Sequence, residues 1–91
     1  MIIKNFMEEV VFNLIEDVLK NVDVCKCEKC KMDIAAIVLN NLPPKYVVTE
    51  QGELYSKINI LLNQFGVDVI SEITKAAILV SNNPHHQVVD F

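Results

Sequence analysis

Apolar residues recur at helical spacing along the first quarter of the chain. From residue 3 to about residue 21 they stand at four-residue steps in two adjacent rows, while Glu, Asp and Lys occupy the remaining face. This pattern predicts an amphipathic helix with one face on the core. The rows are Phe6, Val10, Leu14 and Val18, and Met7, Val11, Ile15 and Leu19.

Residues 31–41 predict a second helix. Its apolar side chains fall on most of its circumference, so we expect it to be buried almost all round. Asn40-Asn41 ends the pattern, and Pro43-Pro44 prevents any continuation of the helix. The apolar members are Met32, Ile34, Ala35, Ile37, Val38, Leu39 and Leu42.

The longest periodic stretch, from Glu53 to about Ser81, predicts a third helix. One apolar stripe suits a core contact: Leu54, Ile58, Leu61, Leu62, Phe65, Val69, Ile73, Ala76, Ala77 and Val80. A second flank is wider than one core contact requires: Tyr55, Ile60, Val67, Ile70, Ile78 and Leu79. Gly66 leaves open whether this helix is continuous.

Lys45–Thr49 is a short β-prone run that follows the prolines. Its expected partner is either the same strand in a second subunit or residues 87–91. The predicted fold is therefore mostly α, with residues 1–91 forming a single small domain. It has three main helices, the last of them long, a short β segment and, between the first two helices, a loop with three cysteines that is predicted to bind a metal.

Composition favours an oligomer. Hydrophobic residues make up 52% of only 91 residues, more than one small subunit can bury, so we expect a homodimer. The longest apolar run, Ile34–Leu39, is far short of the roughly 20 residues that span a membrane. Glu8 and Glu9 stand where a signal peptide needs its apolar core, so a cytoplasmic protein is expected.

Charge and missing motifs exclude several functions. The formal net charge is −4, from eight lysines and twelve acidic residues, with no arginine to grip phosphate bidentately. A general nucleic-acid binder is therefore not expected. The sequence shows neither a nucleophile–base pair nor a Gly-rich phosphate loop, and we expect no enzymatic activity.

All three cysteines lie in one C-x-C-x2-C cluster formed by Cys25, Cys27 and Cys30. The C-x2-C spacing lets two sulfur atoms converge on one ion from a tight turn, and Cys25 adds a third. Structural zinc is the favoured interpretation. The interleaved lysines, Lys26, Lys29 and Lys31, are expected to offset the charge of the zinc thiolates and to hold the thiol pKa values down.

Other interpretations of the cluster remain open. Three buried free thiols, an iron–sulfur cluster completed by another subunit, a redox-active C-x2-C or a thiol and metal sensor would use the same residues. A disulfide fits less well because the count is odd. A fourth zinc ligand is available in His86 or His85, with His86 preferred, although both are equally consistent with solvated residues past a helix end. Water or a second chain could also fill that position.

Two features carry a resemblance to a known family: the cysteine cluster, and a segment placed between a short and a long helix, Leu42-Pro43-Pro44-Lys45-Tyr46-Val47-Val48-Thr49. The sequence resembles the late competence protein ComFB family over nearly the whole chain. The resemblance implies a small, mostly helical, zinc-binding homodimer without known catalytic activity, encoded in some bacteria beside DNA-uptake genes. It places metal ligands at Cys25, Cys27 and Cys30. A fourth cysteine found near the C-terminus of some relatives is missing here, where His85 and His86 stand close by.

The resemblance leaves two functions open. The first is a regulator or adaptor that acts through a protein partner. The second is a receptor for cyclic dinucleotides, because some relatives look like such receptors; here Lys45, Tyr46 and Thr49 would be the binding residues. Against the second stands the simpler interpretation that Tyr46 and Val48 pack in a dimer-forming strand.

Overall fold

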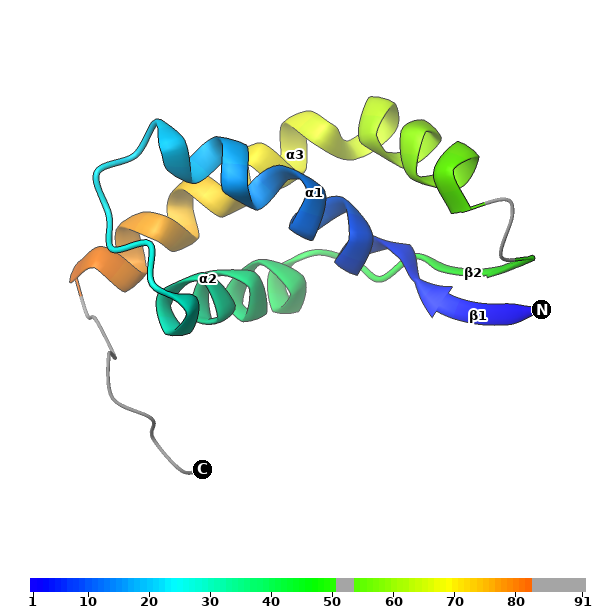
Figure 1. Ribbon diagram of the computed structural model, residues 1–91, viewed down its shortest axis with the longest axis horizontal. Helices are drawn as coiled ribbons and strands as arrows, with labels where there is room; N and C mark the ends of the chain where they lie inside the picture. The colour runs from blue at the N-terminus through cyan, green and yellow to red at the C-terminus, as the bar shows by residue number, and fades with distance from the viewer. Residues whose placement is uncertain (51–53, 83–91) are drawn as a thin grey trace.

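The computed structural model describes residues 1–50 and 54–82. In chain order the elements are β1 (Ile2–Asn5), α1 (Phe6–Lys20), α2 (Glu28–Asn41), β2 (Tyr46–Thr49) and α3 (Leu54–Asn82). The three helices form most of the molecule, and the two strands form a small antiparallel sheet at one end (Figure 1). The predicted mostly α fold, with a long last helix and a short β segment, is confirmed.

One core joins the three helices. α2 runs antiparallel to α1 and α3, and α3 packs against both of the others (Figure 1). Within the described ranges, no helix combines the length and the hydropathy that a membrane span needs. The buried side chains of this core are Met7, Val10, Val11, Ile15, Leu19, Cys30, Ile34, Ala35, Val38, Val69, Ile73, Ala76, Ala77 and Val80.

The first helix begins later than its apolar pattern predicts. Residues 2–5 form β1, and its register with β2 pairs Ile2 with Thr49 and Asn5 with Tyr46. A second subunit or residues 87–91 was the expected partner of β2; β1 takes that role instead. Residues 87–91 lie outside the described residues.

Asn5 explains why the strand gives way to the helix at this point. It takes the N-cap position of α1 in an extended conformation, and its Oδ1 accepts a hydrogen bond of 3.2 Å from the N–H of Met7. The same oxygen accepts a hydrogen bond of 2.9 Å from the N–H of Lys45. The carbonyl of Lys45 in turn accepts a hydrogen bond of 2.8 Å from the N–H of Phe6. One side chain therefore starts the helix and fastens the segment that leads into β2.

We expect Asn5→Ala to lower the free energy of unfolding by about 1–2 kcal/mol, because two backbone N–H groups lose their acceptor. Urea denaturation measures the change. Asn13→Ala is the matched control, since Asn13 lies in the same helix and its amide donates to the Glu9 carbonyl at an exposed position. It should leave stability unchanged or raised, because alanine is the better helix former. Equal losses in the two variants would refute the double role of Asn5.

α2 differs from its prediction at its start and in its burial. It begins at Glu28 rather than at residue 31, because Cys27 has the extended backbone of an N-cap and its carbonyl accepts from the N–H of Lys31 at 3.0 Å. Met32 is 47% exposed and Ala36 is also exposed. The expectation that this helix is buried almost all round is therefore wrong: one face enters the core and the other meets water.

α3 is continuous through Gly66, where an added Cβ would meet no atom within 4 Å. The second apolar flank predicted for this helix lies outside the core, with exposed fractions from 42% to 83% for Ile60, Val67, Ile70, Ile78 and Leu79. Tyr55, the remaining member, lies outside the residues whose side chains are described. α1 and α2 thus leave one side of α3 uncovered.

At 3.6 residues per turn, the most outward residues of α3 form a single line opposite the core. We call Ile60, Val67, Ser71 and Ile78 the outer stripe; all four are exposed and none is charged. Their spacing of seven, four and seven residues keeps them on one side of the helix. The outer stripe is an uncharged, partly apolar surface that runs along most of α3.

Candidate metal centre

The three cysteines come together where the chain passes from α1 to α2. Their Sγ atoms all lie within 4.8 Å of one another. In a tetrahedral zinc site with Zn–S bonds of about 2.3 Å, neighbouring sulfur atoms are about 3.8 Å apart. A contraction of about 1 Å or less therefore converts the observed cluster into three corners of such a site. Sulfur is also the donor type that structural zinc prefers, so the donor set fits the ion.

Local structure holds each cysteine in place. After α1 ends, the chain makes a tight turn in which the N–H of Val24 donates to the Val22 carbonyl at 3.0 Å, and both valines pack against the core. Cys25 and Cys27 follow as exposed residues, Cys27 being the N-cap of α2. Cys30 lies one helical turn later and is fully buried in the core. The site is thus anchored to the core by one ligand and open to solvent at the other two.

The Cys30 thiol does not have the lowered pKa expected from the sequence. Burial, together with hydrogen bonding and charge repulsion from the sulfur groups of Cys27 and Cys25, raises the pKa of Cys30 from 9.0 to about 12. A thiol in this position holds its proton at neutral pH when no metal is bound. Metal binding must displace that proton, so metal affinity falls as the pH falls.

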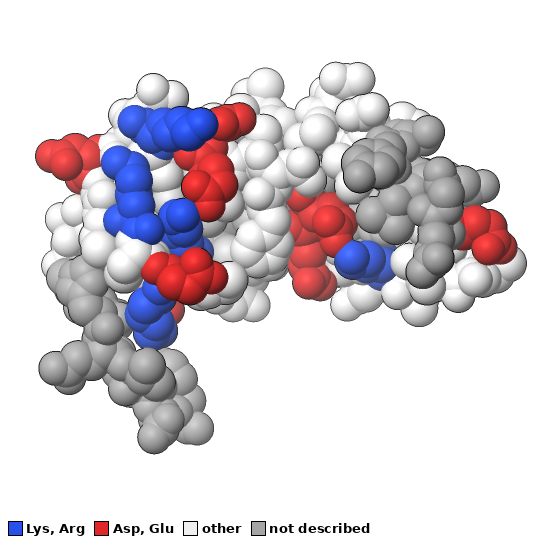
Figure 2. Space-filling model, in the orientation of Figure 1, with Lys and Arg blue, Asp and Glu red and all other residues white. Residues whose placement is uncertain are grey.

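Two of the three interleaved lysines have carboxylate partners of their own. Lys29 Nζ lies 2.7 Å from Asp33 Oδ1, and Lys31 Nζ lies 2.8 Å from Glu16 Oε1, a contact that raises the pKa of Lys31. The charges of Lys29 and Lys31 are thus already paired with acids, and the expected compensation of thiolate charge by lysine is weaker than predicted. Figure 2 shows the result, with lysines and acids interleaved over this end of the molecule.

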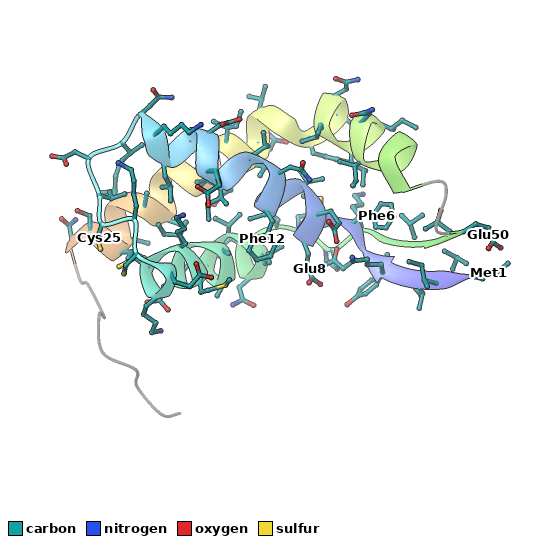
Figure 3. The ribbon with its side chains drawn as sticks, viewed as in Figure 1. Met1, Phe6, Glu8, Phe12, Cys25 and Glu50 are labelled. Atoms are coloured by element: carbon teal, nitrogen blue, oxygen red, sulfur yellow. The ribbon has the colours of Figure 1, made fainter. Side chains whose placement is uncertain are left out.

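His85 and His86, the predicted sources of a fourth ligand, lie outside the described residues. The last described helix, α3, ends at Asn82, and its end lies at the same end of the molecule as Cys25 (Figure 3). The two histidines follow three and four residues after that point in the sequence. The chain therefore reaches the cysteine end of the molecule shortly before the histidines.

The structure does not gather Lys45, Tyr46 and Thr49 on one surface. Tyr46 is 67% exposed and Thr49 only 2%, as expected for residues three apart on a strand, which point to opposite faces. The Thr49 hydroxyl donates to the Glu50 carbonyl at 3.1 Å. Lys45 Nζ lies over the Phe65 ring, 5.0 Å from its centroid. Binding of a cyclic dinucleotide by these residues stays a prediction.

A groove that the sequence did not predict opens between the end of α1 and the middle of α3. Its volume is about 420 Å³, and Leu14, Asp17, Val18, Asn21, Val22, Ile70 and Thr74 line it. Ile70 thus lies beside α1, away from the outer stripe. This placement separates Ile70 from Ile78, which the apolar pattern had grouped together.

Fold and site together define a small, mostly helical protein with a three-cysteine candidate metal centre at a helix junction. The chain belongs to the late competence development protein ComFB family, whose sequence model matches residues 4–84. The resemblance inferred from the cysteine cluster and the proline-led segment is therefore confirmed.

A curated protein and a solved structure, both named ComFB and both from Bacillus subtilis, are similar to this chain. The competence protein ComFB of strain 168 is 28% identical over 60 residues, which cover 66% of this chain and 61% of that protein. The match thus spans about three-fifths of the length of the relative. A solved structure of the late competence protein ComFB superimposes with a TM-score of 0.81 at 24% identity, covering 93% of this chain and 97% of the other, and shows the same fold.

Proposed function

We propose that this protein is a cytoplasmic, zinc-binding homodimer without catalytic activity, which acts as a regulator or adaptor in competence or DNA uptake. Membership of the ComFB family supports the link to competence. The observation that carries the molecular part is the convergence of three sulfur atoms at the junction of α1 and α2. Zinc held there would fix the angle between the two helices.

A structural zinc ion suits this site better than a catalytic metal ion would. Three thiolates and one further N or S ligand close a tetrahedral site and leave no open position for a reacting water molecule. Its role is then to stabilise the fold, since binding a structural metal contributes directly to folding free energy. A domain of 91 residues, near the lower end of what folds on its own core, benefits most from such a contribution.

The outer stripe supports the homodimer. Val67 is 83% exposed, and Ile60 and Ile78 are 58% and 54% exposed, so about half or more of each side chain meets water in one subunit. A two-fold pairing of α3 with its copy would bury the same residues from both subunits, which is the commonest symmetry of oligomers. None of the four residues is charged, so burying their own side chains desolvates no ion.

Two measurements on the purified protein test this proposal. Elemental analysis without added metal should find about one zinc per subunit, and light scattering at micromolar concentration should give the mass of two chains. Iron in place of zinc, or no metal, would overturn the zinc assignment. A monodisperse monomer would overturn the assembly.

We propose His86 as the fourth zinc ligand, with His85 as the alternative. His86→Ala should then weaken zinc retention against a chelator far more than His85→Ala does, because only the ligand leaves the ion short of a donor when removed. The two variants serve as controls for each other, because the two histidines are adjacent in the sequence and both are replaced by alanine. If both retain zinc as the wild type does, the fourth position belongs to water or to another chain.

A further inference from the structure

Asp33 on α2 has one carboxylate oxygen that the described residues leave without a partner. Its Oδ1 accepts a hydrogen bond from Lys29 Nζ at 2.7 Å. Its Oδ2 is buried, and nothing in residues 1–50 or 54–82 donates a hydrogen bond to it. The side chain as a whole is only 24% exposed.

A buried carboxylate oxygen without a donor is costly. Leaving a buried polar atom unsatisfied destabilises a protein by about 1–3 kcal/mol, and by more when the group is charged. Native proteins therefore supply almost every such atom with a donor. The salt bridge to Lys29 accounts for one oxygen of Asp33 and leaves the other to be explained.

The position of Asp33 points to the metal centre as the source of that donor. Asp33 follows Cys30 by three residues, so the two side chains leave neighbouring positions on the same side of α2. Side chains of a helix lean toward its N-terminus, which here is the cysteine end. Lys29, which lies between Cys27 and Cys30 in the sequence, contacts this carboxylate, so the ion pair links Asp33 to the turn that carries the ligands.

We infer that Asp33 is the supporting carboxylate of the metal centre, with Oδ2 accepting a hydrogen bond from the group that occupies the fourth position on the metal. This inference rests on the proposed zinc site. The atoms that converge on one point are the three sulfurs and do not include Asp33, so the carboxylate acts through the fourth ligand rather than on the ion.

Two kinds of fourth ligand carry the required donor. A histidine bound to zinc through one ring nitrogen presents the N–H of the other, and such N–H groups almost always donate to a carboxylate, a carbonyl or a water molecule. A zinc-bound water molecule presents an O–H instead. In both cases the hydrogen bond orients the ligand and strengthens its hold on the ion, which makes Asp33 a positioning residue.

Asp33→Asn tests the inference, with Lys29→Gln as its control. Asp33→Asn should weaken zinc binding about 10- to 100-fold in a chelator competition, the usual effect of removing such a supporting group. Lys29→Gln breaks the salt bridge but leaves Oδ2 in place, and its zinc affinity should stay much closer to that of the wild type. The melting temperature of the metal-free protein should change no more in Asp33→Asn than in Lys29→Gln, because each variant removes one partner of the same salt bridge.

The outcomes separate this inference from the zinc site itself. Wild-type protein that binds no zinc overturns both. If the wild type binds zinc no more tightly than Asp33→Asn does, the role of Asp33 alone is overturned. The same holds if Asp33→Asn loses equal stability with and without metal, because Asp33 would then be a purely structural residue.

Combination with the histidine variants identifies the donor. If Asp33→Asn adds nothing to His86→Ala, or nothing to His85→Ala, then that imidazole is the group that donates to Oδ2. If its effect persists in both backgrounds, the donor is zinc-bound water or a ligand from another chain. Either result supports the inference.

Discussion

Cys27→Ser is expected to abolish stoichiometric zinc binding and to lower the free energy of unfolding by about 4 kcal/mol, the stabilisation that a ligand gives at a thousand times its Kd. For a domain of this size, that loss corresponds to a fall in melting temperature of at least about 15 °C. The physical reason is that two thiolates cannot hold the ion as three do, and the metal contributes to folding. Calorimetry and elemental analysis of the same sample measure both effects.

Two features make Cys27 the informative ligand to replace. It is exposed, so serine leaves no cavity in the core, and it is an N-cap whose side chain makes no capping hydrogen bond. Serine is itself a favourable N-cap, so a loss of stability that a chelator also produces in the wild type belongs to the metal. Wild-type protein treated with a chelator should fall to the level of Cys27→Ser, and the chelator should leave the variant unchanged. A variant that melts like the untreated wild type would remove the case for a structural metal.

Ile78→Asp is expected to convert the proposed homodimer to monomer, with the dimer dissociation constant raised at least about a hundredfold, or about 2.7 kcal/mol. The two-fold axis brings two copies of the new carboxylate into one interface, where each must give up its water or take up a proton. Sedimentation equilibrium or light scattering across a dilution series gives the constant.

Leu79→Asp provides the matched control for Ile78→Asp. Leu79 is the next residue, its exposed fraction is 55% against 54% for Ile78, and it lies about 100° around the helix from the outer stripe. The same acid placed there should leave the dimer intact. Dissociation by both variants would mean that the interface is not centred on the outer stripe, and dissociation by neither would place it elsewhere on the molecule.

The helices were predictable because each carries an apolar face long enough to show its period. α3 ends within one residue of its predicted end, and the flank of α3 predicted to lie outside the core is exposed. The burial of α2 was harder to predict, because Met32 and Ala36 are as apolar as its core residues, and only the positions of α1 and α3 decide which side is covered.

β1 was missed because Ile2 and Ile3 extend the apolar character of the helix that follows them. The signal that marks the boundary was present: Asn5 precedes Glu8 by three residues, the spacing of a capping box at a helix start. The pairing of β1 with β2 could not be predicted from either strand, since four residues carry little information about a partner more than 40 positions away.

The cysteine cluster was predictable from spacing alone, whereas its electrostatics were not. Lysines next to cysteines in the sequence suggested thiols with lowered pKa values. In the fold, however, Cys30 is buried in the core, and Lys31 forms an ion pair with Glu16 of another helix. Asp33 had a weaker signal, a position one turn beyond the last cysteine and four residues beyond Lys29. The role proposed for Asp33 follows from the burial of a single oxygen atom, which no sequence pattern predicts.

The α1–α2 pair is joined at both of its ends. At one end lies the cysteine loop, and at the other Asn5 and the strand pairing tie the start of α1 to the segment after α2. Residues 2–49 therefore form a loop whose two ends, β1 and β2, are in contact. Forming the contacts at one end of the helix pair restricts the chain, so less conformational entropy is lost when the contacts at the other end form. The helix pair should consequently open as one cooperative unit rather than fray from either side.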